Sequence, residues 1–336
     1  MLPSSPVLPR RLGPASALAA LLLVTGCGGG GTGRADPPGS PSASTTGAST
    51  SSTASASATS PANPHVADAQ QFTGKDFGDG QVRQTVLVGA RSGVTMTVWV
   101  WTPPQYDDPR YAHSDFPVLF LYPGGDGASY NNWTDRSYSA LDVVRTGSAN
   151  GSVLPFVLVM PEMQVSKDLD TECTDLPGEP AVGTFLDTDV PTMVRDDFRV
   201  TAPGRGWGTA GASSGAYCAA AIALRHPEDY GAVVSIAGYF DMETNLPQRK
   251  DPAVQALYPT ALAAQGRAGF PVLLLAGTAS PDDVTRAQRF AQLLRPPATA
   301  EVSLQQGGQH LTTSFKAVMP QVFAFFSRHL SGPTPS

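Results

Sequence analysis

Charged residues are scarce in this chain of 336 residues, and basic residues are fewer than acidic ones. Lys and Arg number 22 against 28 Asp and Glu, so the charged fraction is 15% and the formal net charge is −6. A nucleic-acid-binding surface needs a concentration of positive charge, which this composition does not offer. We therefore expect no nucleic-acid partner. The hydrophobic fraction of 41% is sufficient for a substantial core.

Cysteine is also rare, and the motifs of several cofactor-binding classes are missing. The three cysteines and five histidines form no cluster with zinc spacing. No phosphate-binding glycine loop of the usual type occurs. The acidic run at residues 168–175 lacks the spacing of a calcium loop, so we interpret it as a solvated loop over the functional site. We therefore expect a protein without a metal or a cofactor.

The N-terminal segment has the pattern of an export signal. The pair Arg10-Arg11 precedes an apolar run at residues 12–24 that is too short to remain as a membrane-spanning helix. The run ends in Val24-Thr25-Gly26-Cys27, which resembles the lipobox of bacterial lipoproteins, where the cysteine becomes the lipid-modified first residue. We predict a lipoprotein signal peptide at residues 1–26 and lipidation of Cys27. An ordinary secretory signal is the alternative.

A segment poor in large apolar side chains follows. Residues 28–65 are mainly Gly, Ser, Thr, Ala and Pro. Such a segment cannot bury enough surface to offset its conformational entropy, so we predict a disordered tether over residues 27–65. The folded domain should occupy residues 66–332, lipid-anchored to the outer face of the bacterial cytoplasmic membrane or secreted. In such a compartment Cys173 and Cys218 could form a disulfide, a question that the sequence leaves open.

The rest of the chain alternates between strand and helix patterns. Two β-rich runs, residues 84–88 and 94–101, flank a Gly-containing turn and predict an antiparallel opening hairpin. Continuous apolar runs predict strands buried on both faces of a sheet, and apolar residues at helical spacing predict the covering helices. The strand runs are residues 116–122, 154–160, 232–237, 270–276 and, more weakly, 301–305, and the helical runs are residues 184–198, 215–225, 284–294 and 313–330. The fold class is therefore α/β, with a mostly parallel central sheet and helices on both faces.

One pentapeptide carries the strongest chemical signal. Gly211-Ala212-Ser213-Ser214-Gly215 stands between a short Gly-rich strand and an Ala-rich helix. This G-x-S-x-G pattern presents a serine at a sharp turn, where glycines avoid the collisions that a Cβ atom would cause. We predict Ser213 as the nucleophile of acyl transfer and the backbone N–H of Ser214 as an oxyanion donor. A second donor should follow the strand at residues 116–122, where Gly125 is the preferred candidate and Asp126 the alternative.

A serine nucleophile needs a general base on a later loop, and His310 is the histidine that fits. It follows a late strand at the end of Gln306-Gly307-Gly308-Gln309-His310. The other histidines lie in the tether, in a polar loop or in predicted helices: His65, His113, His226 and His329. The acid that orients His310 should follow the strand at residues 270–276, where two aspartates are adjacent. We favour Asp282 and keep Asp283 as the alternative.

Together these motifs resemble an esterase family of the α/β-hydrolase superfamily that includes esterase D-like enzymes and the secreted mycolyltransferases. The resemblance covers most of residues 80–330. It implies an α/β-hydrolase fold, a triad of Ser213, His310 and an aspartate near position 282, and oxyanion donors at Ser214 and near Gly125. Relatives often carry the acid at the position of Ser280 here, and methionine at that of Ser214. The motifs on which this family resemblance rests are residues 116–125, 130–133, 157–161, 211–215, 224–227, 231–240 and 307–310.

The functional prediction is a serine carboxylic ester hydrolase that works through an acyl-enzyme outside the cytoplasm. A small or lipid-like neutral ester suits the negative net charge and the tether. Two alternatives remain open. The acyl group could pass to a sugar hydroxyl, as in the mycolyltransferases. The chain could instead be a surface lipoprotein that binds without efficient catalysis, which the displaced acid favours. The oligomeric state does not follow from the sequence.

Overall fold

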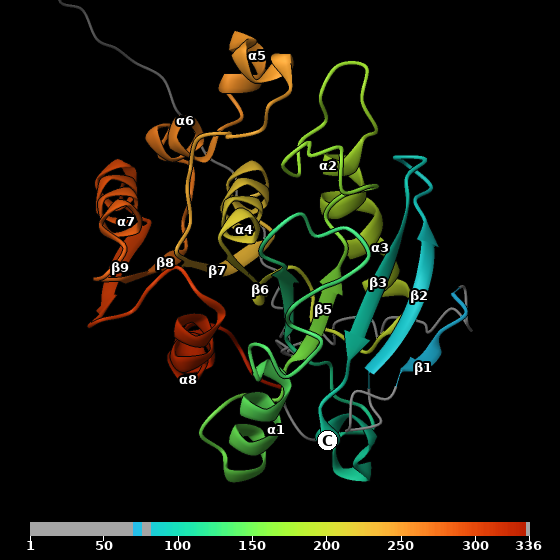
Figure 1. Ribbon diagram of the computed structural model, residues 1–336. Coiled ribbons are helices and arrows are strands. Elements are labelled where there is room, and N and C mark those ends of the chain that lie inside the picture. The colour runs from blue at the N-terminus through green and yellow to red at the C-terminus, as the bar shows by residue number, and fades with distance from the viewer. Residues whose placement is uncertain (1–69, 76–81, 334–336) are drawn as a thin grey trace, which may run out of the picture. The chain divides into compact units, whose positions relative to one another are not determined.

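A sheet of nine strands is the centre of the part of the chain that the structure describes (Figure 1). The computed structural model describes residues 70–75 and 82–333, which belong to one unit, Pro61–Ser336. The strands are β1 (Thr73–Lys75), β2 (Val82–Val88), β3 (Thr95–Trp101), β4 (Val118–Tyr122), β5 (Val157–Pro161), β6 (Gly204–Ala212), β7 (Tyr230–Ile236), β8 (Pro271–Gly277) and β9 (Thr299–Gln305). Their order is β1-β2-β3-β5-β4-β6-β7-β8-β9. The pairs up to β3–β5 are antiparallel, and all pairs from β5–β4 to β8–β9 are parallel.

Helices lie on both faces of this sheet. The α-helices are α1 (Ala140–Asn150), α2 (Val182–Thr184), α3 (Val190–Asp197), α4 (Ser214–Arg225), α5 (Pro252–Gln255), α6 (Pro259–Ala264), α7 (Pro281–Leu293) and α8 (Thr312–His329). Shorter turns are the 3-10 helices η1 (Pro104–Asp107), η2 (Pro109–Tyr111) and η4 (Pro247–Lys250) and the π-helical turn η3 (Phe185–Asp189). Helices α3, α4 and α7 pack on one face, and α1 and α8 pack on the other (Figure 1).

Strand β4 shows why the central strands read as continuous apolar runs. All five of its residues are buried. Phe120 and Tyr122 belong to the core under α4, whereas Leu119 and Leu121 belong to the core under α8. Successive side chains of a strand point to opposite faces, so a strand covered on both sides has no solvent face to mark with polar residues. Full burial of each of these side chains stabilises the fold by about 1.5–3 kcal/mol.

The predicted opening hairpin is present as β2 and β3. Its turn is closed by a hydrogen bond from Gly89 N to Val94 O of 2.8 Å. The carboxylate of Asp189, from η3, accepts hydrogen bonds from the backbone N–H groups of Arg91 and Ser92. The turn is therefore held by a residue that lies 98 positions after Arg91 and 97 positions after Ser92 in the sequence.

The predicted fold class is confirmed, although some boundaries differ. The helix expected over residues 184–198 is divided into η3 and α3, with Pro191 in the first turn of α3, where a missing N–H is tolerated.

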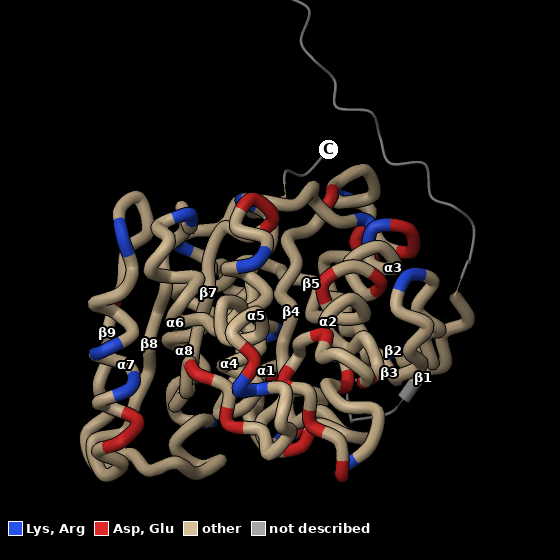
Figure 2. The backbone as a smooth tube through the Cα atoms, turned by 90° about the horizontal axis from the view of Figure 1, so that it is seen from above, with Lys and Arg blue, Asp and Glu red and all other residues tan. Residues whose placement is uncertain are grey.

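The predicted signal peptide, the lipidated Cys27 and the tether lie outside the described residues. No helix within residues 70–75 and 82–333 is long and apolar enough to cross a membrane. In Figure 2 Lys and Arg are distributed over several elements rather than gathered on one.

The structure contains a disulfide between Cys173 and Cys218, a pairing that the sequence did not decide. Cys173 and Cys218 are bonded, with their Cα atoms 5.5 Å apart and 45 positions between them in the sequence. The bond joins the loop after β5 to the middle of α4. Both residues are buried, with exposures of 1%. The loop is therefore attached covalently to the helix that begins beside Ser213.

Candidate active site

Ser213 stands at a sharp turn between β6 and α4. Its φ and ψ are 55° and −119°, a conformation that side-chain-bearing residues rarely adopt. A Cβ atom at Gly211 would collide with the Gly215 carbonyl group, and one at Gly215 would collide with the Tyr122 carbonyl oxygen. Both glycines are therefore required by lack of space. The predicted elbow is the observed local structure, and it leaves Ser213 half-exposed beyond the end of β6.

The structure brings Ser213 and His310 together although they lie 97 positions apart in the sequence. His310 Nε2 lies 3.0 Å from Ser213 Oγ, and His310 Nδ1 lies 2.9 Å from a carboxylate oxygen of Asp283. With the Nδ1 proton donated to the carboxylate, Nε2 is free to accept the serine proton. The His310 side chain is 40% exposed and that of Asp283 is 6% exposed, so solvent reaches the imidazole but hardly the carboxylate.

The acid partner of His310 is Asp283 and not Asp282, which corrects the choice made from the sequence. Both follow Pro281 in the first turn of α7. Each residue of an α-helix turns the side chain by about 100°, so neighbours cannot face the same way. Asp282 points to solvent, whereas Asp283 lies on the buried face with Ala287 and Phe290. The spacing i, i+4, i+7 of these three residues is a sequence signal that would have selected Asp283.

The loops after β8 and β9 interlock and so position His310. The His310 N–H donates a 2.9 Å hydrogen bond to Ser280 Oγ, and the Gly307 N–H donates one of 2.8 Å to Thr278 Oγ1. A Cβ atom at Gly277 would collide with the backbone of Gly308, in the loop that follows β9. The ring of Phe315 contacts the imidazole edge-on, with centroids 5.3 Å apart. Ser280 thus holds the backbone of His310, and the carboxylate beside the imidazole comes from Asp283.

The predicted oxyanion donors Ser214 and Gly125 also lie side by side. Ser214 Oγ donates a 2.6 Å hydrogen bond to the carbonyl oxygen of Gly125. Gly125 has φ +86°, and a Cβ atom there would also collide with the hydroxyl of Tyr130, so glycine is required for two reasons. A Cβ atom at Gly124 would lie 3.1 Å from the carbonyl oxygen of Ala212. The glycine loop after β4 therefore packs directly on the elbow.

The acidic run at residues 168–175 is not the solvated loop that we expected throughout its length. Glu172 is 4% exposed and Thr174 is 2% exposed. Glu172 accepts hydrogen bonds from the Tyr239 hydroxyl, at 2.8 Å, and from the Glu243 N–H, at 2.9 Å. Burial raises the pKa of Glu172 to about 8, although these hydrogen bonds act in the opposite direction. Cys173 of this segment is also bonded to Cys218 of α4, so the buried part of the run is attached to the core.

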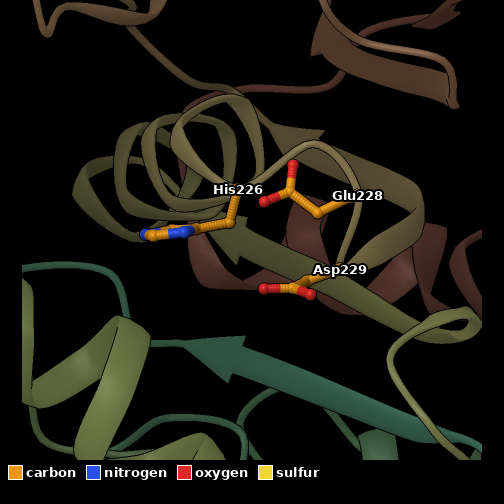
Figure 3. A group of neighbouring side chains, drawn as sticks. All are labelled: His226, Glu228 and Asp229. Atoms are coloured by element: carbon orange, nitrogen blue, oxygen red, sulfur yellow. The ribbon is translucent and has the colours of Figure 1, made fainter.

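A group of possible metal ligands, His226, Glu228 and Asp229, lies at the far end of α4 from Ser213 (Figure 3). The imidazole extends away from the two carboxylates in this view. Its Nε2 lies 3.2 Å from a carboxylate oxygen of Asp187. The hydrogen bond to Asp187 raises the pKa of His226. We therefore assign this histidine to an ion pair between α4 and η3.

The sheet order, the elbow and the hydrogen-bonded Ser213, His310 and Asp283 define the protein as an α/β-hydrolase. The model of the family described as "Putative esterase" matches residues 89–319, which is more than half of the chain. The chain therefore belongs to this esterase family, and the family resemblance noted in the sequence is confirmed. Family membership also supports the expectation of an ester hydrolase.

Similar solved structures agree with the fold. A ferulic acid esterase is 18% identical, with a TM-score of 0.62 over 77% of this chain and 99% of that one. An S-formylglutathione hydrolase from Agrobacterium tumefaciens is 16% identical, with a TM-score of 0.60 over 78% and 99% of the two chains. A Corynebacterium glutamicum protein described as uncharacterized is 29% identical over 141 residues, which are 42% of this chain and 32% of that protein. The match thus spans about a third of that relative's length.

Proposed function

We propose that this protein is an extracytoplasmic serine hydrolase that cleaves carboxylic esters through an acyl-enzyme intermediate. One observation carries the proposal. The Ser213 hydroxyl, the His310 imidazole and the Asp283 carboxylate form a continuous chain of hydrogen bonds of 3.0 Å and 2.9 Å. A serine hydroxyl is a weak nucleophile unless an adjacent base accepts its proton, and the base must be held in the correct tautomer. This arrangement meets both requirements.

In the proposed reaction Ser213 Oγ attacks the ester carbonyl carbon while His310 Nε2 takes its proton. Asp283 stabilises the imidazolium that forms. The carbonyl oxygen becomes an oxyanion, which the backbone N–H groups of Ser214 and Gly125 would stabilise. The tetrahedral intermediate then collapses: the bond between the carbonyl carbon and the leaving oxygen breaks, the imidazolium protonates this oxygen, and the alcohol departs while the acyl group stays on Ser213. Water, deprotonated by His310, attacks the acyl carbon. The bond to Ser213 Oγ breaks, the imidazolium returns the proton to Oγ, and the carboxylic acid leaves.

The proposed location outside the cytoplasm is supported by two independent features. Disulfides persist in oxidising compartments, and the Cys173–Cys218 bond joins two buried residues of the domain. The sequence around Cys27 has the pattern of a lipoprotein export signal. Mass analysis of the mature protein tests this part: a diacylglyceryl-modified N-terminal Cys27 is expected, and an unprocessed N-terminus would exclude the anchor.

The activity is tested with p-nitrophenyl esters of graded acyl length and with a fluorophosphonate probe. We expect turnover of at least one ester and covalent labelling of Ser213 in the wild-type protein. Ser213→Ala should abolish both, because it removes the attacking oxygen. Ser148→Ala is the matched control and should leave both unchanged, because the Ser148 hydroxyl bonds only the Arg145 carbonyl oxygen and the Gln105 side chain among the described residues, neither of which belongs to the site. A wild-type protein that neither turns over any ester nor takes the label would overturn the proposal.

A further inference from the structure

Two hydroxyl groups hold the glycine loop that follows β4. Tyr130 Oη donates a 2.9 Å hydrogen bond to the carbonyl oxygen of Gly124, and Ser214 Oγ donates one of 2.6 Å to that of Gly125. Gly125 and Gly127 have positive φ angles of 86° and 63°. Glycine has the greatest backbone freedom of any residue, so such a loop keeps one conformation only if other groups fix it. The two hydroxyl groups meet this need.

The hydrogen bond from Ser214 is unusual for a serine at the start of a helix. Serine hydroxyls near helix N-termini commonly bond to backbone groups of their own turn. The Ser214 hydroxyl instead reaches a loop 89 positions earlier in the chain. It can do so because Gly215 has no side chain to separate α4 from the end of β4, where Tyr122 and Pro123 present their carbonyl oxygens. The bond therefore connects the nucleophile elbow to the loop.

We propose that the Ser214 side chain is a positioning residue for the oxyanion hole, assisted by the Tyr130 hydroxyl. Ser214 thus supplies one oxyanion donor through its backbone N–H, and its side chain holds the Gly125 carbonyl of the loop that carries the second donor, the Gly125 N–H. The peptide that contains this N–H is held by Tyr130 through the Gly124 carbonyl. This inference rests on the proposed esterase activity, since it concerns the charge that develops during ester cleavage. In the mechanism proposed above only the backbone N–H of Ser214 takes part, and this inference adds a role for its side chain.

The directions of the two carbonyl groups identify which N–H serves as the second donor. In a trans peptide the C=O and N–H groups point in opposite directions. The Gly125 carbonyl points toward Ser214, so the Asp126 N–H of the same peptide points away from Ser214. The preceding peptide is fixed by Tyr130 through the Gly124 carbonyl, which sets the direction of the Gly125 N–H. These directions favour the Gly125 N–H over the Asp126 N–H as the second donor.

The expected effect follows from the role of the bond in the transition state. Loss of a complete oxyanion donor lowers kcat by about 10²–10³-fold. Ser214→Ala keeps both backbone donors but releases the loop, so we expect a loss of about 10-fold to 100-fold in kcat. KM should change by less than about twofold, because the oxyanion exists only after attack. Phosphylation by a fluorophosphonate should slow similarly, because its P=O oxygen also gains negative charge during attack.

The experiment compares wild-type protein with Ser214→Ala, Ser214→Thr and Ser148→Ala. The measurements are kcat and KM for p-nitrophenyl butyrate, the rate of fluorophosphonate labelling and Tm. Thr keeps a hydroxyl at the same position, so Ser214→Thr should recover most of the kcat that Ser214→Ala loses. Ser148→Ala should match the wild type. Tyr130→Phe removes the second hydroxyl and should also lower kcat with little change in KM, which provides a separate test if Ser214→Ala does not fold.

The two proposals fail in different ways. Absence of turnover and labelling in the wild-type protein overturns the proposed function. An active wild type together with Ser214→Ala and Tyr130→Phe variants that keep wild-type kcat overturns only the positioning role. A loss that appears in KM rather than kcat, or one that Ser214→Thr does not recover, assigns the side chain to substrate binding or packing and likewise overturns it.

Discussion

Asp283→Asn removes the negative charge from the carboxylate that lies 2.9 Å from His310 Nδ1 and leaves the shape of the side chain almost unchanged. During attack by Ser213 the imidazole becomes positively charged. Opposite charges about 4 Å apart, at an effective dielectric constant of about 20, attract each other by about 4 kcal/mol. This energy corresponds to a factor of about 10³ in rate. The amide can also hold the imidazole in the wrong tautomer, which brings the expected loss in kcat to about 10⁴-fold.

The adjacent aspartate provides a matched control. Asp282→Asn removes the same charge one residue earlier in α7, at an exposed position. Solvent screens such a charge, so kcat should stay within about twofold of the wild type. The assay is steady-state hydrolysis of p-nitrophenyl butyrate at pH 7, with Tm recorded for both variants. Equal losses in the two variants, or an Asp283→Asn variant that keeps more than a tenth of the wild-type kcat, would refute the assignment of the acid.

Three further predictions concern the scaffold. Gly215→Ala should destabilise the fold by about 3 kcal/mol in urea unfolding, because the added methyl group meets the Tyr122 carbonyl, a backbone atom that cannot move aside. Replacing Cys173 and Cys218 by serine should lower the free energy of unfolding by about 4 kcal/mol, as expected for a loop of 45 residues. Glu172 has a folded-state pKa of about 8 against an ordinary value of 4.5, so its contribution to stability is complete below pH 4.5 and is lost as the pH rises through 8. Glu172→Gln should therefore show a flatter pH profile of the unfolding free energy, with a difference of at most about 5 kcal/mol across this window.

Each of these predictions has an outcome that contradicts it. Wild-type stability of Gly215→Ala would mean that α4 can move away from β4. An unfolding free energy unaffected by the cysteine replacements, or by a reductant, would mean that the disulfide constrains nothing beyond the folded contacts. Parallel pH profiles for the wild type and Glu172→Gln between pH 4.5 and 8 would show that the buried carboxyl titrates normally.

The fold class could be predicted from the sequence because each strand and helix carries its own hydrophobic pattern within a short stretch of residues. Strand β4 lies within the predicted apolar run, and the helix after Ser213 follows from the Ala-rich stretch that begins at Gly215. The glycines of the elbow and the order of nucleophile, acid and base along the chain predicted which loops would meet. Boundaries were less accurate around η3, because the π-helical turn and Pro191 interrupt a stretch that carries a continuous helical pattern.

By itself, the sequence determined the α/β fold, the serine at the elbow and the histidine that serves it, since each rests on residue types at short spacing. Tertiary structure decided which of two adjacent aspartates faces His310, because the face of α7 that carries Asp283 packs on β8 and β9. The spacing of Asp283 with Ala287 and Phe290 indicates this buried face but not its contact with His310. Tertiary structure also decided that Cys173 bonds to Cys218, that Glu172 is buried, and that the Ser214 hydroxyl reaches Gly125. These contacts join residues 27 to 89 positions apart, and their geometry depends on how the loops at the ends of the parallel strands pack together.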